Sequence, residues 1–280
     1  MKFGIVADSS SDITDINISN KDIDFSLVSL KLAIGDQEYE DDQNLDIEKF
    51  LYDMENATGE LMTRCPAPAD FQEAYSKSDN VFCFTISSKL SGTYNSAELA
   101  KKLVDEEHTG KNIFVLDSLA TAGNIKMLVE KTIELIDANL EYEEICKELL
   151  LYRDRMYVIF TLGNYTMLIK NGRMSAFAGS IASTLNIRVI ADAKEGSINV
   201  IKKVRGINKC YSSIVEEVNN YTNGEVNKIF IHHCFNEEGA KELARRFKEY
   251  KKDINIEINK CRGLTSFYSQ RGGIIVGFAK

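Results

Sequence analysis

Short apolar runs alternate with longer segments of helical periodicity along most of the chain. The apolar runs predict buried strands at Phe3–Ala7, Asn80–Ile86, Asn112–Asp117, Tyr157–Leu162, Ile187–Ala191, Ile198–Val204, Lys228–His232, Ile254–Ile258 and Gly273–Phe278. The periodic segments predict helices at Ile47–Asn56, Ala69–Lys77, Thr93–Val104, Gly123–Asn139, Tyr142–Asp154, Ile207–Tyr221 and Glu237–Tyr250. Because strands that alternate with helices form parallel sheets covered by those helices, the pattern predicts an α/β fold.

Two regions depart from this alternation. Within Ser26–Asp42, apolar residues occupy every second position before a Gly-Asp pair, which predicts a one-sided strand and a hairpin. Within Arg153–Met156, helices of charged and polar character give way to a new apolar strand. We place a domain boundary there and predict an N-terminal domain over 1–155 and a C-terminal domain over 156–280.

Composition and charge exclude several classes of protein. The 280-residue chain carries a formal net charge of -8 and no basic stripe, so we expect no binding to nucleic acid. Its apolar runs are shorter than the roughly 20 residues of a membrane span, and the N-terminal run is too short for a secretory signal, so we expect a cytoplasmic protein. The six cysteines are widely separated, which predicts reduced thiols and no metal site.

The stretch FTISSKLSGTYNSA, residues 84–97, joins an apolar strand to a helix through a run of hydroxyl residues. The N-terminus of a helix presents unpaired N–H groups and a partial positive charge, which attract anions. Ser91 and Thr93 lie at the predicted helix start, and Gly92 lets a ligand approach the backbone closely. The turn therefore suits a carboxylate or a phosphate, although simple helix capping also favours serine and threonine there.

Similar polar turns occur at three other places in the chain. DSSSD spans Asp8–Asp12 after the first strand, and DSLATAG spans Asp117–Gly123 after another. TRCPAP, which spans Thr63–Pro68, precedes a predicted helix. Because ligands of parallel sheets gather outside the carboxyl ends of the strands, we expect these turns to converge with the hydroxyl turn at one edge.

The sequence contains no motif of a known catalytic mechanism. It lacks a GxSxG nucleophile elbow, a GxxxxGK[ST] phosphate loop, a GxGxxG fingerprint and an HExxH metal motif. His232 and His233 end a strand with their side chains on opposite faces, and we interpret them as core or strand-end residues. An enzyme that acts on a small acyl or phosphorylated substrate, with Asp8 or Asp117 as its base, is the competing hypothesis.

Taken together, the polar segments match a known family. DSSSDI, TRCPAP, ISSKLSGTYNSA, DSLATAG, LIKNGRMS and KVRG occur in the order and spacing of the DegV family of fatty-acid-binding proteins, which the sequence resembles over nearly its whole length. The resemblance implies two α/β domains with a long-chain fatty acid in an apolar pocket between them. The N-terminal domain is then expected to hold a mostly parallel sheet with helices on both faces, and the C-terminal domain a mixed sheet with helices.

The resemblance also implies which residues hold the head group. Thr63 matches the threonine of the family's TSxPS turn, and Ser91 matches the serine of SGTY, whose Gly92 and Thr93 we include in the expected site. Arg173 in NGRMS matches a family arginine and is expected to position the head group or the interdomain loop. Each buried CH₂ contributes about 0.8 kcal/mol, so the hydroxyls are needed for orientation and not for affinity.

Some members of the family are the lipid-presenting subunit of a bacterial fatty acid kinase. By this resemblance we expect a carrier with no catalytic residues and no cofactor, whose partner is an ATP-dependent kinase subunit. Arg205 in KVRG matches another family arginine and is expected to face that partner. A regulatory protein that senses lipid is a further alternative.

The sequence departs from the family pattern in two segments. TRCPA replaces the TSxPS turn, so Arg64 and Ala67 occupy the two serine positions. Near the C-terminus the family commonly has a histidine before a Gly-Pro-Gly turn, whereas this chain reads SQRGG, so we expect Gln270 or Arg271 in the head-group site. The small, apolar segment Ser175–Thr184 either lines an acyl channel or forms a tightly packed helix.

Overall fold

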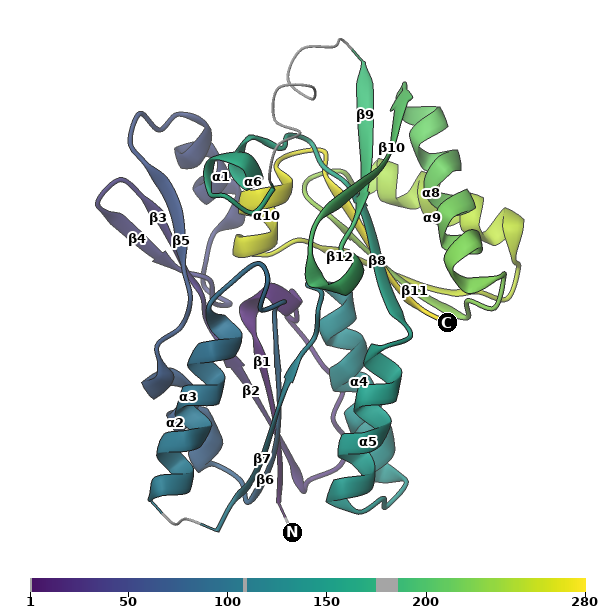
Figure 1. Cartoon of the computed structure of the whole chain (residues 1–280). Helices are drawn as coiled ribbons and strands as arrows, with labels where there is room; N and C mark the ends of the chain where they lie inside the picture. The colour runs from purple at the N-terminus through teal and green to yellow at the C-terminus, as the bar shows by residue number, and fades with distance from the viewer. Residues whose placement is uncertain (1, 108–109, 175–185) are drawn as a thin grey trace.

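The computed structural model describes residues 2–107, 110–174 and 186–280. Within these residues the strands form three sheets (Figure 1). The first sheet is parallel throughout and carries, in spatial order, β2 (Ile23–Val28), β1 (Phe3–Asp8), β6 (Asn80–Thr85) and β7 (Asn112–Asp117). The expectation of a mostly parallel N-terminal sheet is confirmed.

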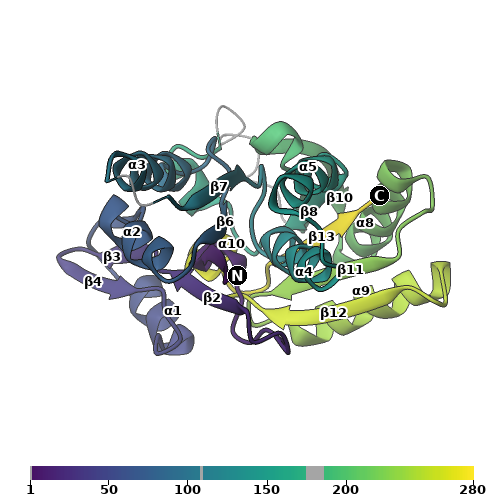
Figure 2. The same cartoon turned by 90° about the horizontal axis from the view of Figure 1, so that it is seen from below.

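Helices cover both faces of this sheet, as Figure 2 shows. They are α2 (Pro68–Ser76) and α3 (Thr93–Glu106) on one face, and α4 (Gly123–Asp137) and α5 (Tyr142–Arg153) on the other. Because successive side chains of a strand point to opposite faces, Val6 and Cys83 pack against α2 and α3, whereas Ile5 and Phe82 pack against α4 and α5. Burial on both faces explains why these strands are continuous apolar runs.

The second sheet is mixed, as expected for the C-terminal part. It carries, in spatial order, β10 (Asn199–Arg205), β9 (Ile187–Asp192), β8 (Met156–Thr161), β13 (Ile274–Ala279), β11 (Lys228–His233) and β12 (Asn255–Lys260). Its β11–β12 pair is parallel, and the other described pairs are antiparallel. Two helices, α8 (Ile207–Thr222) and α9 (Glu237–Tyr250), cover its outer face.

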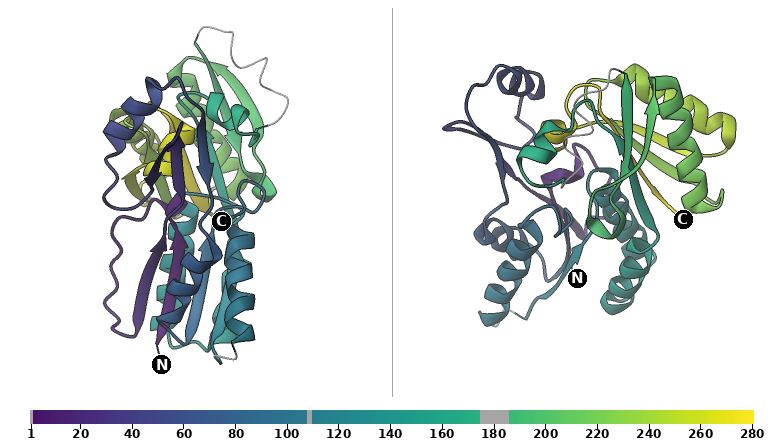
Figure 3. Two further views of the ribbon diagram at one scale, coloured as in Figure 1. Left: turned by 90° about the vertical axis from the view of Figure 1, so that its left-hand side faces the viewer. Right: turned by 45° about the horizontal axis from the view of Figure 1, so that its top comes forward.

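The inner face of the second sheet closes the molecule over the first sheet. Along β8, Ile159 packs against α8 and α9, whereas Val158 and Phe160 point inward. The inner face meets three shorter helices, α1 (Ile47–Glu55), α6 (Thr166–Lys170) and α10 (Gly263–Ser269). The strands of the first sheet end beneath this layer (Figure 3), so their carboxyl ends lie between the two halves of the chain.

The third sheet is small and antiparallel. Its strands are β4 (Gln37–Glu40), β3 (Lys31–Ile34) and β5 (Leu61–Arg64). The predicted hairpin is confirmed at β3 and β4. The prediction of one continuous strand leading into it is wrong, because the strand is interrupted near Leu30. The Leu30 N–H donates to Ser9 Oγ at 3.0 Å, and the Leu30 carbonyl accepts from the Asp41 N–H at 2.9 Å. These contacts separate β2 from β3, which then join different sheets.

The first and second sheets share no hydrogen-bonded strand pair within the described ranges. They are joined instead by the packing of α4 against the second sheet. A Cβ on Gly123 would lie 2.5 Å from the Phe230 side chain, so glycine is required where α4 meets β11. The division into domains 1–155 and 156–280 stays a prediction.

Two fully buried carboxylates lie where the sheets meet. The Asp8 side chain, at the end of β1, accepts from the Ile86 N–H at 2.6 Å and the Ser10 N–H at 2.9 Å. Burial raises the pKa of Asp8 to about 6, although these hydrogen bonds act in the opposite direction. Burial likewise raises the pKa of Asp41 to about 7, and the negative charge of Asp12 adds to the effect.

The free energy of unfolding is expected to fall as the pH rises because of Asp41. Its ordinary pKa is 3.8, so between that value and about 7 the folded state holds more protons than the unfolded state. The stability contribution is complete below pH 3.8 and is lost as the pH passes about 7, with a slope of up to about 1.4 kcal/mol per pH unit. Urea denaturation of the wild type and Asp41→Asn from pH 4 to 8 measures it.

The difference in unfolding free energy, wild type minus Asp41→Asn, is expected to decrease up to about pH 7 and then level off. The same comparison for Asp8→Asn is expected to level off near pH 6. A difference that is constant or increases over this range would contradict the prediction for either residue.

Candidate functional site

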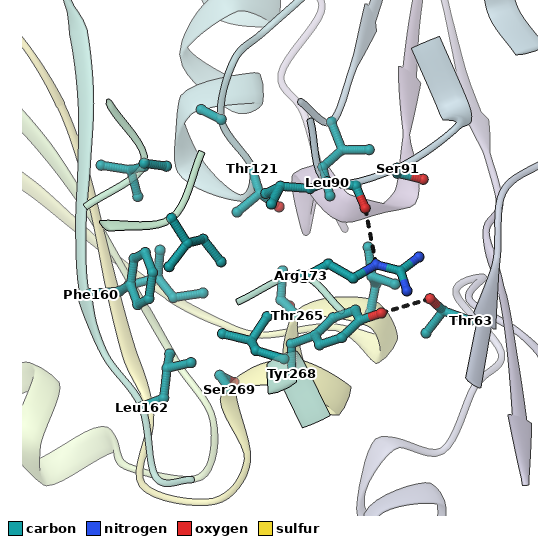
Figure 4. A pocket seen from close by; sticks show the side chains of 18 of the residues that line it. Thr63, Leu90, Ser91, Thr121, Phe160, Leu162, Arg173, Thr265, Tyr268 and Ser269 are labelled. Carbon is teal, nitrogen blue, oxygen red and sulfur yellow. Dashed lines mark hydrogen bonds between the residues drawn. The ribbon is translucent and has the colours of Figure 1, made fainter. Parts of the chain in front are cut away.

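An apolar cavity lies between the carboxyl edge of the first sheet, the third sheet and the inner face of the second (Figure 4). The empty space in it, including the opening to solvent, is about 750 Å³. The apolar part is lined by Leu30, Ile86, Leu90, Ala120, Val158, Phe160, Leu162, Leu168, Ala193, Ile198, Leu264 and Ile275. The polar lining residues are Thr63, Ser91, Thr121, Arg173, Thr265, Tyr268 and Ser269.

The regular side-chain periods of strand β8 and helix α10 place these side chains in the cavity. Alternate residues of β8 point inward, so Val158 and Phe160 line the cavity, and Leu162 continues the series. On α10, residues four positions apart share one face of the helix. Tyr268 and Leu264 therefore line the cavity together.

The polar end of the cavity contains a hydroxyl pair and a guanidinium. Thr63, which pairs with Leu32 across β3 and β5, places its Oγ1 2.9 Å from the Tyr268 hydroxyl. The Arg173 Nε donates to the Leu90 carbonyl at 3.1 Å, and Nη1 donates to the Asn171 carbonyl at 2.5 Å. Figure 4 shows the guanidinium between the Leu90 segment and the Thr63–Tyr268 pair.

Arg173 has no carboxylate partner within the part of the chain that the structure describes. The ion pairs of these residues do not include it. The remaining residues, 1, 108–109 and 175–185, contain no Asp or Glu. Within residues 2–107, 110–174 and 186–280, the hydrogen bonds of its half-buried guanidinium go to neutral carbonyl groups, so its positive charge is available to an anion.

Tyr268 can donate a hydrogen bond to the same anion. Burial raises the pKa of Tyr268, so its hydroxyl stays protonated, and the charge of Arg173 has the opposite, smaller effect. The distance to Thr63 shows that one of these two hydroxyls donates to the other. The acceptor of that pair keeps its own proton for a ligand.

Ser91 lies on the opposite side of the cavity mouth from Tyr268. Its Oγ is 2.8 Å from Thr93 Oγ1, at the start of α3. The TRCPAP turn packs against the start of α3 here, because a Cβ on Gly92 would lie in ordinary contact with Cys65 Sγ, at 3.4 Å. Gly92 and Thr93 support the turn and are not among the residues that line the cavity.

The predicted convergence of polar turns is confirmed for three of the four. Thr63, Ser91 and Thr121 come from three different turns and line the same cavity. The fourth turn, DSSSD, lies behind the lining, where the Ser10 carbonyl accepts from Thr121 Oγ1 at 3.2 Å. The DSSSD turn therefore supports the DSLATAG turn, which carries Thr121.

The structure does not support the expectation that Gln270 or Arg271 holds the head group. Gln270 Nε2 donates to the Phe267 carbonyl at 2.5 Å, and Arg271 Nε forms an ion pair with Glu55 at 2.9 Å. The Arg271 guanidinium also stacks over Phe235, 4.5 Å from the ring centroid. Both residues lie outside the cavity lining, and this part of the chain contributes Tyr268 instead.

The other expected residues lie at the surface or outside the described part. Arg64 is paired with Glu38, and Ala67 precedes α2 without capping it by a side-chain hydrogen bond. Arg205 is exposed at the end of β10, away from the cavity lining. The segment Ser175–Thr184 lies outside the described residues.

The carboxylates considered as catalytic bases have structural partners. Asp117 accepts from the Ser88 and Leu119 N–H groups at 3.1 and 3.0 Å, and neither it nor Asp8 lines the cavity. Among the residues described, the lining contains no Asp, Glu, His or Cys. The same residues provide no group of three or more potential metal ligands, and no helix among them is long and apolar enough to cross a membrane.

Sequence reasoning missed Tyr268 and Thr265. Both lie on α10, which has only seven residues, too few to show a clear helical period. The one available signal is the spacing of four between Leu264 and Tyr268, shortly before the Gly272-Gly273 pair.

Comparison with known proteins agrees with this architecture. The model of the DegV family of uncharacterised proteins matches residues 2–279. A DegV domain-containing protein of Streptococcus pyogenes serotype M18 is 34% identical over 281 residues, covering 99% of each chain.

Two solved structures are similar over almost the whole chain. The Streptococcus pneumoniae fatty acid kinase (Fak) B3 protein loaded with linoleic acid has a TM-score of 0.95 and 32% identity, covering 100% of this chain and 99% of the other. A DegV family protein from Eubacterium eligens loaded with heptadecanoic acid has a TM-score of 0.93 and 31% identity, covering 99% of each chain. From the match of the family model and these relatives, we conclude that this chain belongs to the DegV family.

Proposed function

We propose that this protein binds one long-chain fatty acid in the cavity. The carboxylate is held by Arg173 and by the hydroxyls of Ser91, Thr63 and Tyr268, and the acyl chain occupies the apolar part. The observation that carries this proposal is the guanidinium without a carboxylate partner at the polar end of an apolar cavity. Only a ligand with one anionic end and a long apolar body complements both parts.

The apolar part of the cavity supplies the affinity. A chain of about 16 carbons gains on the order of 10 kcal/mol from burial before the costs of association. One hydrogen bond contributes far less, about 1 kcal/mol net, and about 1.5–3 kcal/mol when one partner is charged. The polar groups therefore fix which end of the ligand lies at the mouth.

The relatives support the same ligand class. The proteins from Streptococcus pneumoniae and Eubacterium eligens that resemble this chain were crystallised with linoleic acid and heptadecanoic acid. Both share more than 30% of their residues with this chain and superpose over nearly all of it. A similar cavity in this chain would accept an unbranched acyl chain.

We further propose a cytoplasmic carrier that has no catalytic residues and no resident cofactor. The lining described here offers no carboxylate or imidazole to act as a general base. The name of the Streptococcus pneumoniae relative supports an ATP-dependent fatty acid kinase subunit as partner. Arg205, exposed on the edge strand β10, is the residue we assign to that contact.

Solvent extraction of the protein as purified from a bacterial host tests the ligand class. We expect mass spectrometry to find one fatty acid per chain, because a largely apolar site retains its ligand through purification. The native mass should exceed the sequence mass by that of the fatty acid. A protein that is empty and also fails to bind added oleic acid would refute the proposed function.

Arg173→Gln is expected to weaken binding of oleic acid by about tenfold, in the range of a hydrogen bond to a charged group. Binding of methyl oleate, which carries no charge, should change much less. Lys170→Gln is the matched control, because Lys170 is exposed on α6, three positions away, and does not line the cavity. Titration calorimetry with both ligands measures the effect, and equal losses for acid and ester would exclude Arg173 as the carboxylate ligand.

Arg205→Ala is expected to leave oleic acid affinity unchanged and to reduce formation of acyl phosphate by a fatty acid kinase subunit with ATP. The loss should lie mainly in the apparent KM for the loaded carrier, because a contact at the rim of an interface affects association. Steady-state assays at varied carrier concentration separate KM from kcat. Identical kinetics for the variant and the wild type would remove Arg205 from the interface.

A further inference from the structure

The helix α10 begins without a cap from its own neighbourhood. A helix leaves its first N–H groups without intrahelical acceptors, and a helix of seven residues is unstable in isolation. The Arg262 side chain, at the cap position, provides no capping hydrogen bond. Two carboxylates from the N-terminal part of the chain accept these N–H groups instead.

Asp12 accepts from the start of α10 and from its first turn. Its Oδ1 accepts from the Arg262 N–H at 2.7 Å and from Thr265 Oγ1 at 2.5 Å. Its Oδ2 lies 2.9 Å from Nδ1 of His232, which is fully buried on β11. Asp12 follows the short helix η1 (Ser9–Ser11) and adopts a φ of 56°, a left-handed conformation that aspartate tolerates better than most residues. Asp12 thus joins the end of β1 to both α10 and β11.

Asp41 accepts the next two N–H groups of α10. Its Oδ1 accepts from Gly263 at 2.8 Å and its Oδ2 accepts from Leu264 at 2.9 Å. A Cβ on Gly263 would lie 2.5 Å from Asp41 Oδ1, so the glycine is needed for this approach. The partial positive charge at the helix N-terminus is complementary to these carboxylate acceptors.

We propose that Asp12 and Asp41 are positioning residues for the fatty-acid site. They fix the start of α10 so that its Tyr268 meets Thr63 and Arg173 at the polar end of the cavity. This inference rests on the proposed function and deepens it, because it assigns a role in binding to two residues that do not touch the ligand cavity.

The C-terminal end of α10 is held by two other hydrogen bonds: the Ser269 carbonyl accepts from the Gly163 N–H at 2.9 Å, and Tyr268 is paired with Thr63. Phe267 packs in the core, with its ring centroid 6.5 Å from that of Phe50 on α1, and apolar packing of this kind is non-directional. The hydrogen bonds to Asp12 and Asp41 are directional and charge-assisted. Loss of the carboxylates would release the N-terminal end of α10 from these contacts and let Tyr268 shift relative to Thr63.

The test is titration calorimetry with oleic acid at pH 8, above the pKa of about 7 of Asp41. Asp41→Ala removes both acceptors and is expected to weaken binding by about tenfold or more. Asp41→Asn keeps one acceptor oxygen, so its affinity for oleic acid should lie between those of the wild type and Asp41→Ala. The matched control is Asp46→Ala, which removes the side-chain cap of α1, an acceptor of the Lys49 N–H at 3.0 Å, and should leave oleic acid binding unchanged.

A double-mutant cycle with Tyr268→Phe separates positioning from general loss of stability. If Asp41 acts through Tyr268, Tyr268→Phe costs clearly less affinity in the Asp41→Ala background than in the wild type. Additive losses would overturn the proposal, and so would unchanged affinity in Asp41→Ala. If Asp41→Ala does not fold, the same cycle is measured with Asp41→Asn. A smaller loss from Tyr268→Phe in that background supports the proposal, and additive losses or unchanged affinity in Asp41→Asn overturn it.

Hydrogen exchange distinguishes failure of this inference from failure of the proposed function. If the wild type binds no oleic acid, the proposed function is refuted, while the positioning role is still measured by amide exchange of Gly263 and Leu264, which donate to Asp41. Those amides should exchange faster in Asp41→Ala than in Asp46→Ala, because their acceptors are gone. Equal exchange in the two variants would overturn the positioning role.

Discussion

The site depends on buried carboxylates that accept backbone N–H groups from distant segments. Asp8 holds Ile86, which leads into the turn of Ser91, and Asp12 and Asp41 hold the start of α10. A buried carboxylate must be hydrogen-bonded, so each of these residues fixes the segment that satisfies it. Asp8 and Asp12 act from the carboxyl end of β1, and Asp41 acts from the end of β4 in the third sheet. This arrangement lets two halves with separate sheets share one cavity.

The cavity separates affinity from orientation. Its apolar lining offers no directional contact, and an acyl chain could slide or reverse within it. In the proposed function Arg173 removes that freedom, because neutral carbonyls of Leu90 and Asn171 hold it without neutralising its charge. A carboxylate partner from the protein would have made the guanidinium a structural ion pair, as it does for Arg271 with Glu55. The absence of such a partner in the described chain distinguishes a binding arginine from a structural one.

The sequence predicted the parts of the fold that repeat over several turns or strands. Each long helix was found, and so was each strand of the two large sheets except β2, because their periodicity is sustained over enough residues. Thr63, Ser91 and Arg173 were found through family resemblance and line the cavity. The short elements β5 and α10 were missed because tertiary hydrogen bonds, such as those from Asp41, stabilise them. Such contacts join residues more than 200 positions apart, and no local pattern encodes them.

The expectation that Arg271 holds the head group was wrong for the same reason. Its absence from the cavity changes the chemistry of the site. Glu55 and Phe235 both hold the Arg271 guanidinium. In the proposed site the head group therefore contacts hydroxyls and Arg173. Hydroxyls and guanidinium groups do not titrate near neutral pH, whereas a histidine would. Within the described lining, no protein group at the proposed ligand contacts titrates near neutral pH. If Asp41 positions α10 as proposed, its protonation would reach the site through that helix, because burial raises its pKa to about 7.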